Sequence, residues 1–408
     1  MPGAGPFAPT YTAALRRLQD FVPRAGAEYT RLRNYDLADE GHPHVSGLSP
    51  YLRHRLLTEK DVLQAVLGRH SLQAAEKFVQ EVYWRTYWKG WLEMRPSVWT
   101  AYKAGLTKAL DRVQAESGLR TAWEEACRGE TDIEAFNAWA RELFETGYLH
   151  NHARMWFASI WIFTLRLPWE LGADFFLRHL LDGDAASNTL SWRWVAGLQT
   201  QGKNYVARAS NISKYTRGRH RPLRQLAVEP DPLSGPPHPP RIEPPLQGTW
   251  NPGLATGLLL TDEDLSPSFL VAQGLKPDAV AVLDATRARS PLHVSETVLA
   301  FARGAIDDTL QRHFAGSDAS IPILDGSNGI ADWAARNGLA QVVTPYAPVG
   351  PASDTLAHLC TDAPDLSLVQ VVRTYDLEAW PHAKAGFFRF KEKIPSLLGS
   401  LRGLKPAQ

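Results

Sequence analysis

The chain has 408 residues, of which 44% are hydrophobic, and a formal net charge of +1. That length exceeds what one ordinary hydrophobic core needs, so we expect two domains. No uncharged apolar run reaches the roughly 18 residues of a membrane span, and the N-terminus lacks the pattern of a signal peptide. The two cysteines, Cys127 and Cys360, match no metal-ligand spacing, and we expect them to be small buried side chains in a cytoplasmic protein.

Helices are expected over residues 10–225. Apolar residues recur at helical spacing within residues 15–21, 62–67, 75–92 and 133–149. Ser49-Pro50 and Thr58, the latter followed by acidic residues, are typical of helix starts. We therefore predict an all-helical first domain.

The composition changes between residues 226 and 254, where prolines crowd the chain. Such a segment favours extended polyproline geometry, so we predict a linker or a strap on the surface. Beyond it, short β-branched, apolar runs at 257–261, 279–283, 321–324, 341–344 and 368–372 alternate with amphipathic segments at 294–314 and 329–337. This alternation predicts a parallel α/β sheet with crossover helices. No glycine-rich phosphate motif follows any strand, so no dinucleotide or triphosphate site is expected there.

Charge is distributed unevenly along the chain. Residues 1–245 contain 31 basic and 26 acidic residues, whereas the remainder contains 13 and 17. A basic cluster closes the helical segment, and its members are Lys214, Arg217, Arg219, Arg221 and Arg224. Such a cluster can follow a phosphate backbone, and it is equally typical of a solvated linker edge.

Polar residues of fixed type alternate with aromatic runs between Gly147 and Trp194. The motifs are GYLHNHARM over 147–155, DGDAASN over 182–188 and WRW over 192–194. Polar groups buried beside Trp156, Phe157 and Trp161 need partners, because an unpaired buried polar group costs about 1–3 kcal/mol. A bound polar cofactor is one way to supply those partners.

This pattern resembles the FAD-binding domain of the photolyase and cryptochrome flavoproteins. Upstream elements fall in the family's order, namely Glu28-Tyr29 with Arg33, the turn SGLSPYL over 46–52 and FVQEVYWR over 78–85. The resemblance covers residues 1–215 and implies noncovalent FAD. It implies an all-helical FAD-binding domain at residues 1–225, followed by a proline-rich linker at 226–254 and a Rossmann-like α/β domain at 255–395.

The resemblance implies FAD-binding roles residue by residue. The turn at 46–49 would hold the diphosphate, since hydroxyls and amides at a helix start suit an anion. A carboxylate beside Arg154 would fix its guanidinium through charge-assisted hydrogen bonds, and Asn188 would lie near the flavin N5 atom. The full set is Tyr29, Ser46, Gly47, Leu48, Ser49, Arg85, Asn151, Arg154, Asp182, Asp184 and Asn188. Taken alone, the turn would be an ordinary helix cap, and Asp182-Gly183-Asp184 would be a surface turn.

Three tryptophans match the family's electron-transfer chain, with Trp192 nearest the flavin, Trp169 next and Trp123 outermost. Trp192 and Trp169 keep the expected separation. Trp123 lies a few residues out of register, and Trp139 is an alternative. Together with Asn188, the three are the candidate catalytic residues; otherwise these tryptophans simply fill the core.

Photolyases flip a pyrimidine dimer out of DNA and hold it against the flavin. The resemblance implies a substrate cavity formed by Arg33, Glu81, Trp84, Asn151, His152, Met155 and Trp194, with Arg33 on the DNA side. Departures from the family weaken the DNA argument: His152 replaces a phosphate-contacting arginine, Tyr148 replaces a tryptophan, and the helical tail expected after residue 216 is missing. Arg53-His54-Arg55 stands where relatives have small residues, and its charge would strengthen phosphate binding or reshape the loop.

The α/β segment weakly resembles the family's antenna domain. The features are Asp262-Glu263-Asp264 after the first strand, Tyr346 after a later one and HAKAGFFRFK over 382–391. In relatives this domain precedes the FAD domain, so the order here predicts a circular permutation. An unrelated Rossmann-like domain is the alternative, and the sequence does not identify an antenna chromophore.

The leading hypothesis is a light-driven lyase that resembles cyclobutane pyrimidine dimer photolyase, photoreduced through tryptophans and acting on damaged single- or double-stranded DNA. The alternative is a cryptochrome-like blue-light receptor without repair activity, acting on an unknown protein partner. A light-independent flavin electron-transfer protein is a third hypothesis. None of the three implies a metal or a membrane.

Overall fold

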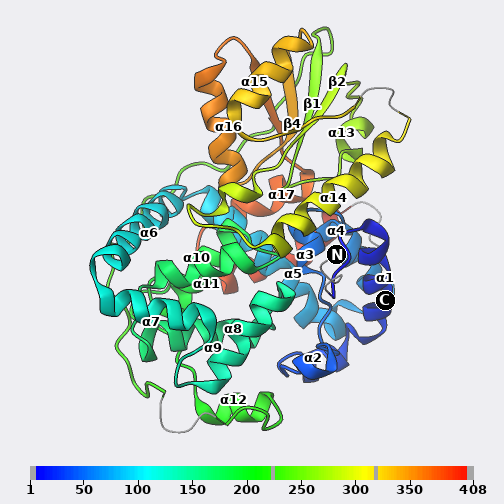
Figure 1. Ribbon diagram of the computed structural model, residues 1–408. Helices are drawn as coiled ribbons and strands as arrows, with labels where there is room; N and C mark the ends of the chain where they lie inside the picture. Colours follow the sequence, from blue (N-terminus) through cyan, green and yellow to red (C-terminus); the bar gives the residue numbers. More distant parts are fainter. Residues whose placement is uncertain (1–5, 222–225, 317–319, 402–408) are drawn as a thin grey trace.

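In the computed structural model, a helical body and a parallel α/β body pack against each other (Figure 1). The structure describes residues 6–221, 226–316 and 320–401. The helical body comes first along the chain and the sheet second, so the predicted fold class is confirmed. Within the described residues, no helix is long and apolar enough to cross a membrane.

The helical body is built around α5 (Leu72–Glu93), which is buried along most of its length. Its other helices are α1 (Tyr11–Phe21), α2 (Ala27–Leu32), α3 (Ser49–Arg53), α4 (Glu59–Leu67), α6 (Ser97–Ala115), α7 (Ser117–Arg128), α8 (Glu134–Thr146), α9 (Asn151–Ser159), α10 (Trp169–His179), α11 (Ala185–Ala196) and α12 (Ala209–Tyr215).

Local sequence signals explain several helix ends. Thr58 forms a capping box with Asp61 at the start of α4, as its sequence context predicts, and Asp184 caps α11 by accepting from the Ser187 amide. Helix α8 ends at Gly147, whose φ of +69° is a left-handed conformation that glycine adopts without strain. These ends fix the loops that carry the 147–155 and 182–188 motifs.

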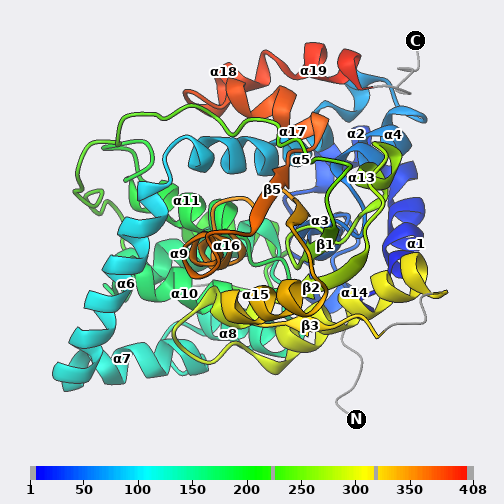
Figure 2. The same ribbon diagram turned by 90° about the horizontal axis from the view of Figure 1, so that it is seen from above.

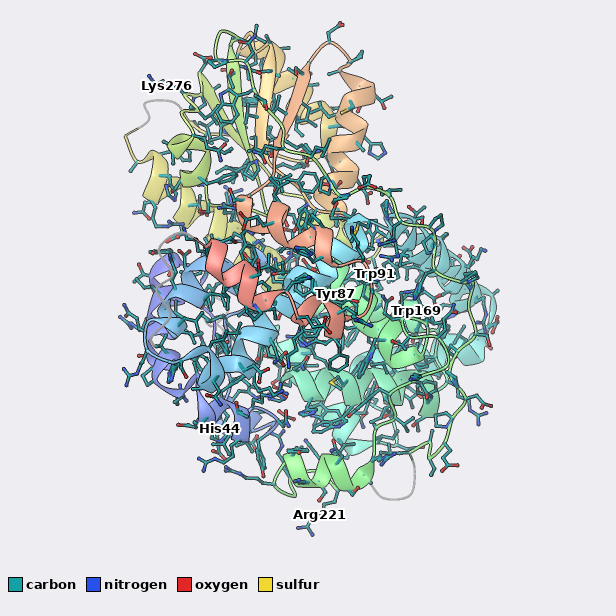
Figure 3. All side chains as sticks on the ribbon, turned by 180° about the vertical axis from the view of Figure 1, so that it is seen from behind. His44, Tyr87, Trp91, Trp169, Arg221 and Lys276 are labelled. Atoms are coloured by element: carbon teal, nitrogen blue, oxygen red, sulfur yellow. The ribbon has the colours of Figure 1, made fainter. Side chains whose placement is uncertain are left out.

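The proline-rich segment 226–254 has no regular secondary structure and forms a strap between the two bodies. Side chains of its neighbours hold it, because Asn204 Nδ2 donates to the Pro230 carbonyl and Gln341 Nε2 donates to the Asn251 carbonyl. The ring of His238 lies edge-on to Trp91, with 5.2 Å between centroids; Trp91 is labelled in Figure 3. Proline cannot donate a backbone hydrogen bond, which suits a segment held through its carbonyl groups.

The sheet contains β1 (Thr256–Thr261), β2 (Ala279–Leu283), β3 (Ile323–Leu324), β4 (Gln341–Pro345) and β5 (Ser367–Val371), all parallel, in the order β3-β2-β1-β4-β5. One face packs beneath α15 (Gly326–Arg336) and α16 (Pro351–Asp362), where Leu259 of β1 lies. Leu258 and Leu260 point to the other face, towards α13 (Ser268–Ala272) and α14 (Glu296–Phe314), and join the core of the helical body. One apolar core therefore runs through both bodies.

The chain returns to the helical body after β5. Helices α17 (Thr374–Ala379) and α18 (Phe387–Lys391) pack on α5, and α19 (Ile394–Ser400) follows beside them (Figure 2). Gly90 of α5 permits this approach, because a Cβ atom there would lie 2.8 Å from the Cα of Trp380. The C-terminal segment thus covers one side of the helix that carries Trp84 and Arg85.

Candidate functional site

Arg154 and Asp182 form a bidentate ion pair. The two guanidinium Nη atoms donate to the two carboxylate oxygens over 3.0 and 2.8 Å, and Nε donates to the Leu149 carbonyl. The Tyr148 ring lies 5.5 Å from the guanidinium carbon. The expectation of a carboxylate beside Arg154 is therefore met, and this arginine is fixed in place while a quarter of its side chain stays accessible.

Asp184 is the centre of a second charged group. Its Oδ2 atom lies 2.7 Å from Lys89 Nζ and 3.4 Å from Arg85 Nη1. Burial alone would raise the pKa of Asp184, but Lys89 and Arg85 together hold it far below its ordinary value. Arg85 also donates to Glu59, and its Nη2 atom is buried without a partner among the described residues. Leaving a buried guanidinium nitrogen unpaired is unfavourable, so this atom can donate a hydrogen bond to an acceptor of a bound molecule.

Asn188 lies one turn beyond Asp184 on α11. Its side-chain amide nitrogen donates to the Ala173 carbonyl over 2.8 Å, which fixes the orientation of the amide group. No hydrogen bond to its side-chain oxygen exists within the described part of the chain, and the residue is buried. The side-chain oxygen of Asn188 is therefore a hydrogen-bond acceptor in a fixed orientation.

The turn at residues 46–49 is compact. The Leu48 amide donates to Ser46 Oγ, Gly47 has a φ of +60°, and α3 begins at Ser49 as the sequence predicts. Tyr29 is buried elsewhere in the same body, edge-on to Phe21 and Phe78. No described contact joins Tyr29 to the turn, and their joint role in cofactor binding stays a prediction.

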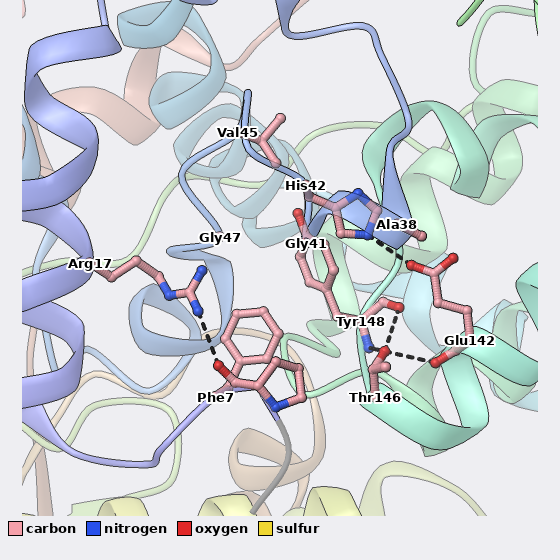
Figure 4. Close-up of a pocket in the computed structure, with 11 residues that line it drawn as sticks. Phe7, Arg17, Ala38, Gly41, His42, Val45, Gly47, Glu142, Thr146 and Tyr148 are labelled. Atoms are coloured by element: carbon pink, nitrogen blue, oxygen red, sulfur yellow. Dashed lines mark hydrogen bonds and ion pairs between the residues drawn. The ribbon is translucent and has the colours of Figure 1, made fainter. Parts of the chain in front are cut away.

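A cavity of about 260 Å³ opens beside this turn (Figure 4). Gly47, Tyr148, His42 and Glu142 are among the residues that line it, and His42 is hydrogen-bonded to Glu142 over 2.8 Å. None of Arg85, Arg154, Asp182 and Asp184 lines it. The volume is also below the roughly 300–1,000 Å³ of typical ligand pockets. We therefore do not equate this cavity with the cofactor site.

On the predicted substrate side, Arg33 forms an ion pair with Glu81 over 2.5 Å. The backbone of Arg33 and Asn34 contacts the imidazoles of His150 and His152, at 3.0 and 2.9 Å respectively. Helix α2 is thereby tied to both α5 and the start of α9. This places Arg33, Glu81 and His152 in one region, together with the exposed Asn151 that begins α9.

Two aromatic residues of that predicted cavity have partners of their own. Trp84 stacks face to face on Phe387 of α18, with ring centroids 3.6 Å apart and an interplanar angle of 12°. Trp194 stacks on Tyr205 at 5.6 Å. Within the described residues the two tryptophans make no ring contact with each other, and Met155 is half-buried between its helical neighbours. The structure thus gathers only part of the predicted substrate set by direct contact.

Trp192 and Trp169, the two inner members of the predicted electron-transfer chain, lie on neighbouring helices, and ring contacts continue from Trp169. Trp192 is fully buried against Phe176, and its indole covers Gly172, one turn along α10 from Trp169. From Trp169 the ring contacts continue to Tyr102 at 5.8 Å and from Tyr102 to Trp99 at 5.2 Å.

The expected outermost tryptophan, Trp123, is half-buried and makes no ring contact within the described part of the chain; its indole nitrogen has no partner there. The proposed alternative, Trp139, stacks on Trp156 and donates to Asp36. The series of ring contacts that begins at Trp169 therefore leads to Trp99, and not to Trp123 or Trp139.

Arg53 and Arg55 do not remain free for a phosphate. Arg53 lies 2.7 Å from Glu263 and 3.3 Å from Asp262, while Arg55 pairs with Asp264 and Asp376. Both arginines are buried, so the basic run of the helical body and the acidic run after β1 neutralise each other across the interface. The interpretation that these arginines strengthen phosphate binding is wrong, because their charge is already balanced.

The switch point of the sheet, between β1 and β4, is partly covered by α5. Glu93 accepts hydrogen bonds from the Tyr346 hydroxyl and the Val349 amide, both at 2.7 Å. Burial raises the pKa of Glu93 to about 7, although these two hydrogen bonds oppose the shift. In open α/β sheets this edge is the usual ligand position, and here a carboxyl group of the helical body fills part of it.

The basic cluster near α12 is partly neutralised. Arg217 pairs with Glu40 over 3.0 Å, and Arg219 pairs with Asp36 and Asp39. Arg221 extends away from the body in Figure 3, and Arg224 lies outside the described residues. Of the two interpretations, the solvated edge fits these contacts better than a phosphate-binding cluster.

Comparison with known proteins identifies the helical segment. Residues 78–219 match the family model described as the FAD binding domain of DNA photolyase. This chain carries a photolyase-family FAD-binding domain. It is 34% identical over 201 residues to a deoxyribodipyrimidine photo-lyase of Synechococcus, covering 48% of this chain and 40% of that protein. For the Escherichia coli K12 enzyme of the same name the identity is 32% over 210 residues, covering 47% and 40%. The chain spans less than half the length of these relatives.

Solved structures give a weaker match. A bacterial class III photolyase from Agrobacterium tumefaciens is 27% identical, with a TM-score of 0.41, over 50% of this chain and 42% of that one. A Synechocystis cryptochrome is 24% identical, also with a TM-score of 0.41, over 51% and 43%. The cofactor of the photolyase-family domain is FAD.

Sequence reasoning missed two residues of the photolyase-family domain and its interface. Lys89 bridges Asp184 and Glu263, at 2.7 and 3.2 Å. Its position four residues after Arg85 on one helix was a usable signal, because residues i and i+4 share a face. Glu263 belongs to the acidic run after β1, and only the fold reveals that this run meets Arg53.

Proposed function

We propose that the charged residues of α5, α9 and α11 hold FAD noncovalently. The main support for this proposal is one observation. The Arg154–Asp182 pair and the Asp184–Arg85–Lys89 group both lie within the segment that matches the FAD-binding model. The fit of FAD to this site is supported by the Nη2 atom of Arg85, which is buried without a partner among the described residues and requires an acceptor such as a cofactor oxygen.

Within this site, each residue has a defined task. Arg154, fixed by Asp182, presents its accessible edge to the flavin ring, and Asp184 orients Arg85 and Lys89. The held side-chain oxygen of Asn188 accepts a hydrogen bond at the N5 side of the ring. The turn at Ser46, Gly47, Leu48 and Ser49, with Tyr29 and Asn151, completes the proposed site.

Bound FAD supplies light absorption and one-electron chemistry. Trp192 and Trp169 would pass electrons towards it from an external reductant, because the indole of Trp192 covers the turn of α10 that follows Trp169. Among the residues of α6, the contacts of Tyr102 and Trp99 offer a continuation that Trp123 lacks.

We propose that the reaction is light-driven splitting of cyclobutane pyrimidine dimers in DNA. Support comes from the relatives named deoxyribodipyrimidine photo-lyase. The resemblance of Glu81, Trp84, Met155 and Trp194 to the family's substrate-cavity residues adds to it. In this role Arg33 is oriented by Glu81 towards the DNA side. A blue-light receptor is the second candidate, favoured by the stacking of Trp84 on Phe387 and by the paired arginines near α12.

We also propose that the α/β body is the family's antenna domain in permuted order, with boundaries at residues 1–225, 226–254 and 255–395. The FAD-domain match falls entirely within the first of these segments, and the parallel sheet follows it. Because Glu93 fills part of the switch point, an antenna chromophore would have to bind elsewhere along the carboxyl edge.

The decisive experiment illuminates the purified protein with an external reductant and a dimer-containing oligonucleotide, and quantifies restored thymines. We expect restoration in blue light, none in the dark, and none for Arg154→Met, which loses the fixed guanidinium. Flavin photoreduction without restored thymines would refute repair and leave the receptor function.

A further inference from the structure

The C-terminal segment 382–393 presents basic and aromatic side chains to solvent. Phe388 is 81% exposed, although Phe387 beside it is buried. Lys384, Arg389 and Lys393 are exposed and form no ion pair within the described residues. An isolated exposed phenylalanine needs no explanation, but one flanked by three unpaired cations has the composition of a surface that binds single-stranded nucleic acid.

This segment adjoins the proposed substrate side. Phe387 stacks on Trp84 at 3.6 Å, and Trp84 lies one helical turn from Glu81, the partner of Arg33. Helix α18 therefore holds Phe387 against one residue of the proposed substrate set, and the exposed Phe388 is its neighbour in the chain.

Two cations of the segment, Lys384 and Lys393, act on the same histidine. The pKa of His382 is lowered first by burial and then by the charges of Lys393 and Lys384, which places both ammonium groups in its vicinity. Lys391 is paired with Glu76, and Glu392 is the one acidic residue between 382 and 393. The remaining charge is positive and unpaired.

The basic cluster near α12 differs from this segment in its arginines. Arg217 and Arg219 are paired with Glu40, Asp36 and Asp39, whereas the exposed Lys214 has no ion pair among the described residues. Exposed cations without a carboxylate partner attract a phosphate backbone more strongly than paired ones, because no intramolecular ion pair must be broken.

We propose that residues 384–393 bind unpaired DNA next to the substrate, with a base stacked on Phe388 and phosphates paired with Arg389 and Lys393. This inference rests on the proposed repair function. It gives the second half of the chain a direct part in recognition of single-stranded or locally opened DNA.

The test measures binding of a fluorescent, undamaged single-stranded oligonucleotide to the FAD-loaded full chain in the dark, by anisotropy at several salt concentrations. Phe388→Ser is expected to weaken binding roughly tenfold, as loss of one stacked base does. The double variant Arg389→Ser with Lys393→Ser should reduce the slope of log affinity against log salt by about 1.4, because two phosphate contacts are lost.

Matched controls use equivalent residues elsewhere. Phe144→Ser removes another phenylalanine, 63% exposed on α8. Lys108→Ser with Lys276→Ser removes two exposed cations, and Lys276 lies on the α/β body far from α18 (Figure 3). These controls should leave affinity and salt slope unchanged.

Equal losses in the controls, or unchanged binding by both test variants, would overturn the proposal. So would a change from dimer to monomer on Phe388→Ser in sedimentation velocity, since the face would then be a contact between copies. Failure of the repair function is distinguishable: in that case the wild-type protein restores no thymines, whatever the anisotropy shows.

Discussion

Asp264 is a buried acidic residue of the interface, and its removal should be costly. It accepts from Arg373 Nε and Nη2 at 2.6 and 2.7 Å and from Arg55 Nη1 at 3.1 Å, and its side chain is 2% exposed. Asp264→Asn keeps the shape but leaves the buried guanidinium of Arg55 and the partly exposed guanidinium of Arg373 with a neutral partner. Breaking a buried pair in this way costs about 3–5 kcal/mol. We expect the lower end, about 3 kcal/mol, because Arg373 keeps its bond to the Ser266 carbonyl and Arg55 keeps Asp376.

This loss of unfolding free energy corresponds to a small decrease in the melting temperature. With an unfolding entropy of about 2.1 cal/mol/K per residue, 408 residues give roughly 0.9 kcal/mol/K, so the melting temperature should fall by about 3–4 °C. Differential scanning calorimetry at pH 7 measures it. The double variant Asp264→Asn with Arg373→Met should lose about 2 kcal/mol less than the sum of the single variants, because the two residues contact each other.

The effect should depend on pH. Burial alone would raise the pKa of Asp264, but Arg373 and Arg55 hold it below its ordinary value. The stabilisation is therefore present above the ordinary pKa near 4 and disappears as pH falls through the folded-state pKa. A melting temperature within about 1 °C of wild type at pH 7, or strictly additive losses, would refute the reasoning.

Three further predictions follow from the site. Glu93→Gln should flatten the decline of stability between pH 5 and 7, because the raised pKa of Glu93 stabilises the fold only while the carboxyl group is protonated. Any gain at pH 8 is offset in part, because a glutamine side chain can accept only one of the two hydrogen bonds that Glu93 accepts. Thermal melts at several pH values measure this, and a persistent decline would contradict it. Arg154→Met should bind FAD at least about tenfold more weakly in fluorescence titration, because Asp182 is left unpaired; wild-type affinity would remove this pair from the site. Trp99→Phe should slow photoreduction more than Trp123→Phe in transient absorption, with the opposite order restoring Trp123 as the outer donor.

The sequence predicted the elements well because each signal was local. Thr58, the proline segment and the β-branched runs act over a few residues, and α4, the strap and the five strands lie where they were expected. The Arg154–Asp182 pair was also foreseeable, since two fixed motifs carry it. The partners of Arg53 were not foreseeable, because they lie about two hundred residues away and only the docking of the two bodies selects them. The stacking of Phe387 on Trp84 depends on the same docking.

The buried ion pairs between the two bodies have a consequence for synthesis of the protein. Arg55 and its partner Asp264 are 209 residues apart, so on the ribosome the arginine emerges long before the carboxylate. At roughly 5–20 residues per second, the interval is roughly 10–40 s. During that time Arg53 lacks Asp262 and Glu263 and Arg55 lacks Asp264 and Asp376, so both arginines must stay hydrated, whereas Lys89 already has Asp184 within the helical body. Final consolidation of the first half therefore waits for translation of the second, and a slow codon stretch after β1 would prolong exposure of the unfinished core to chaperones and proteases.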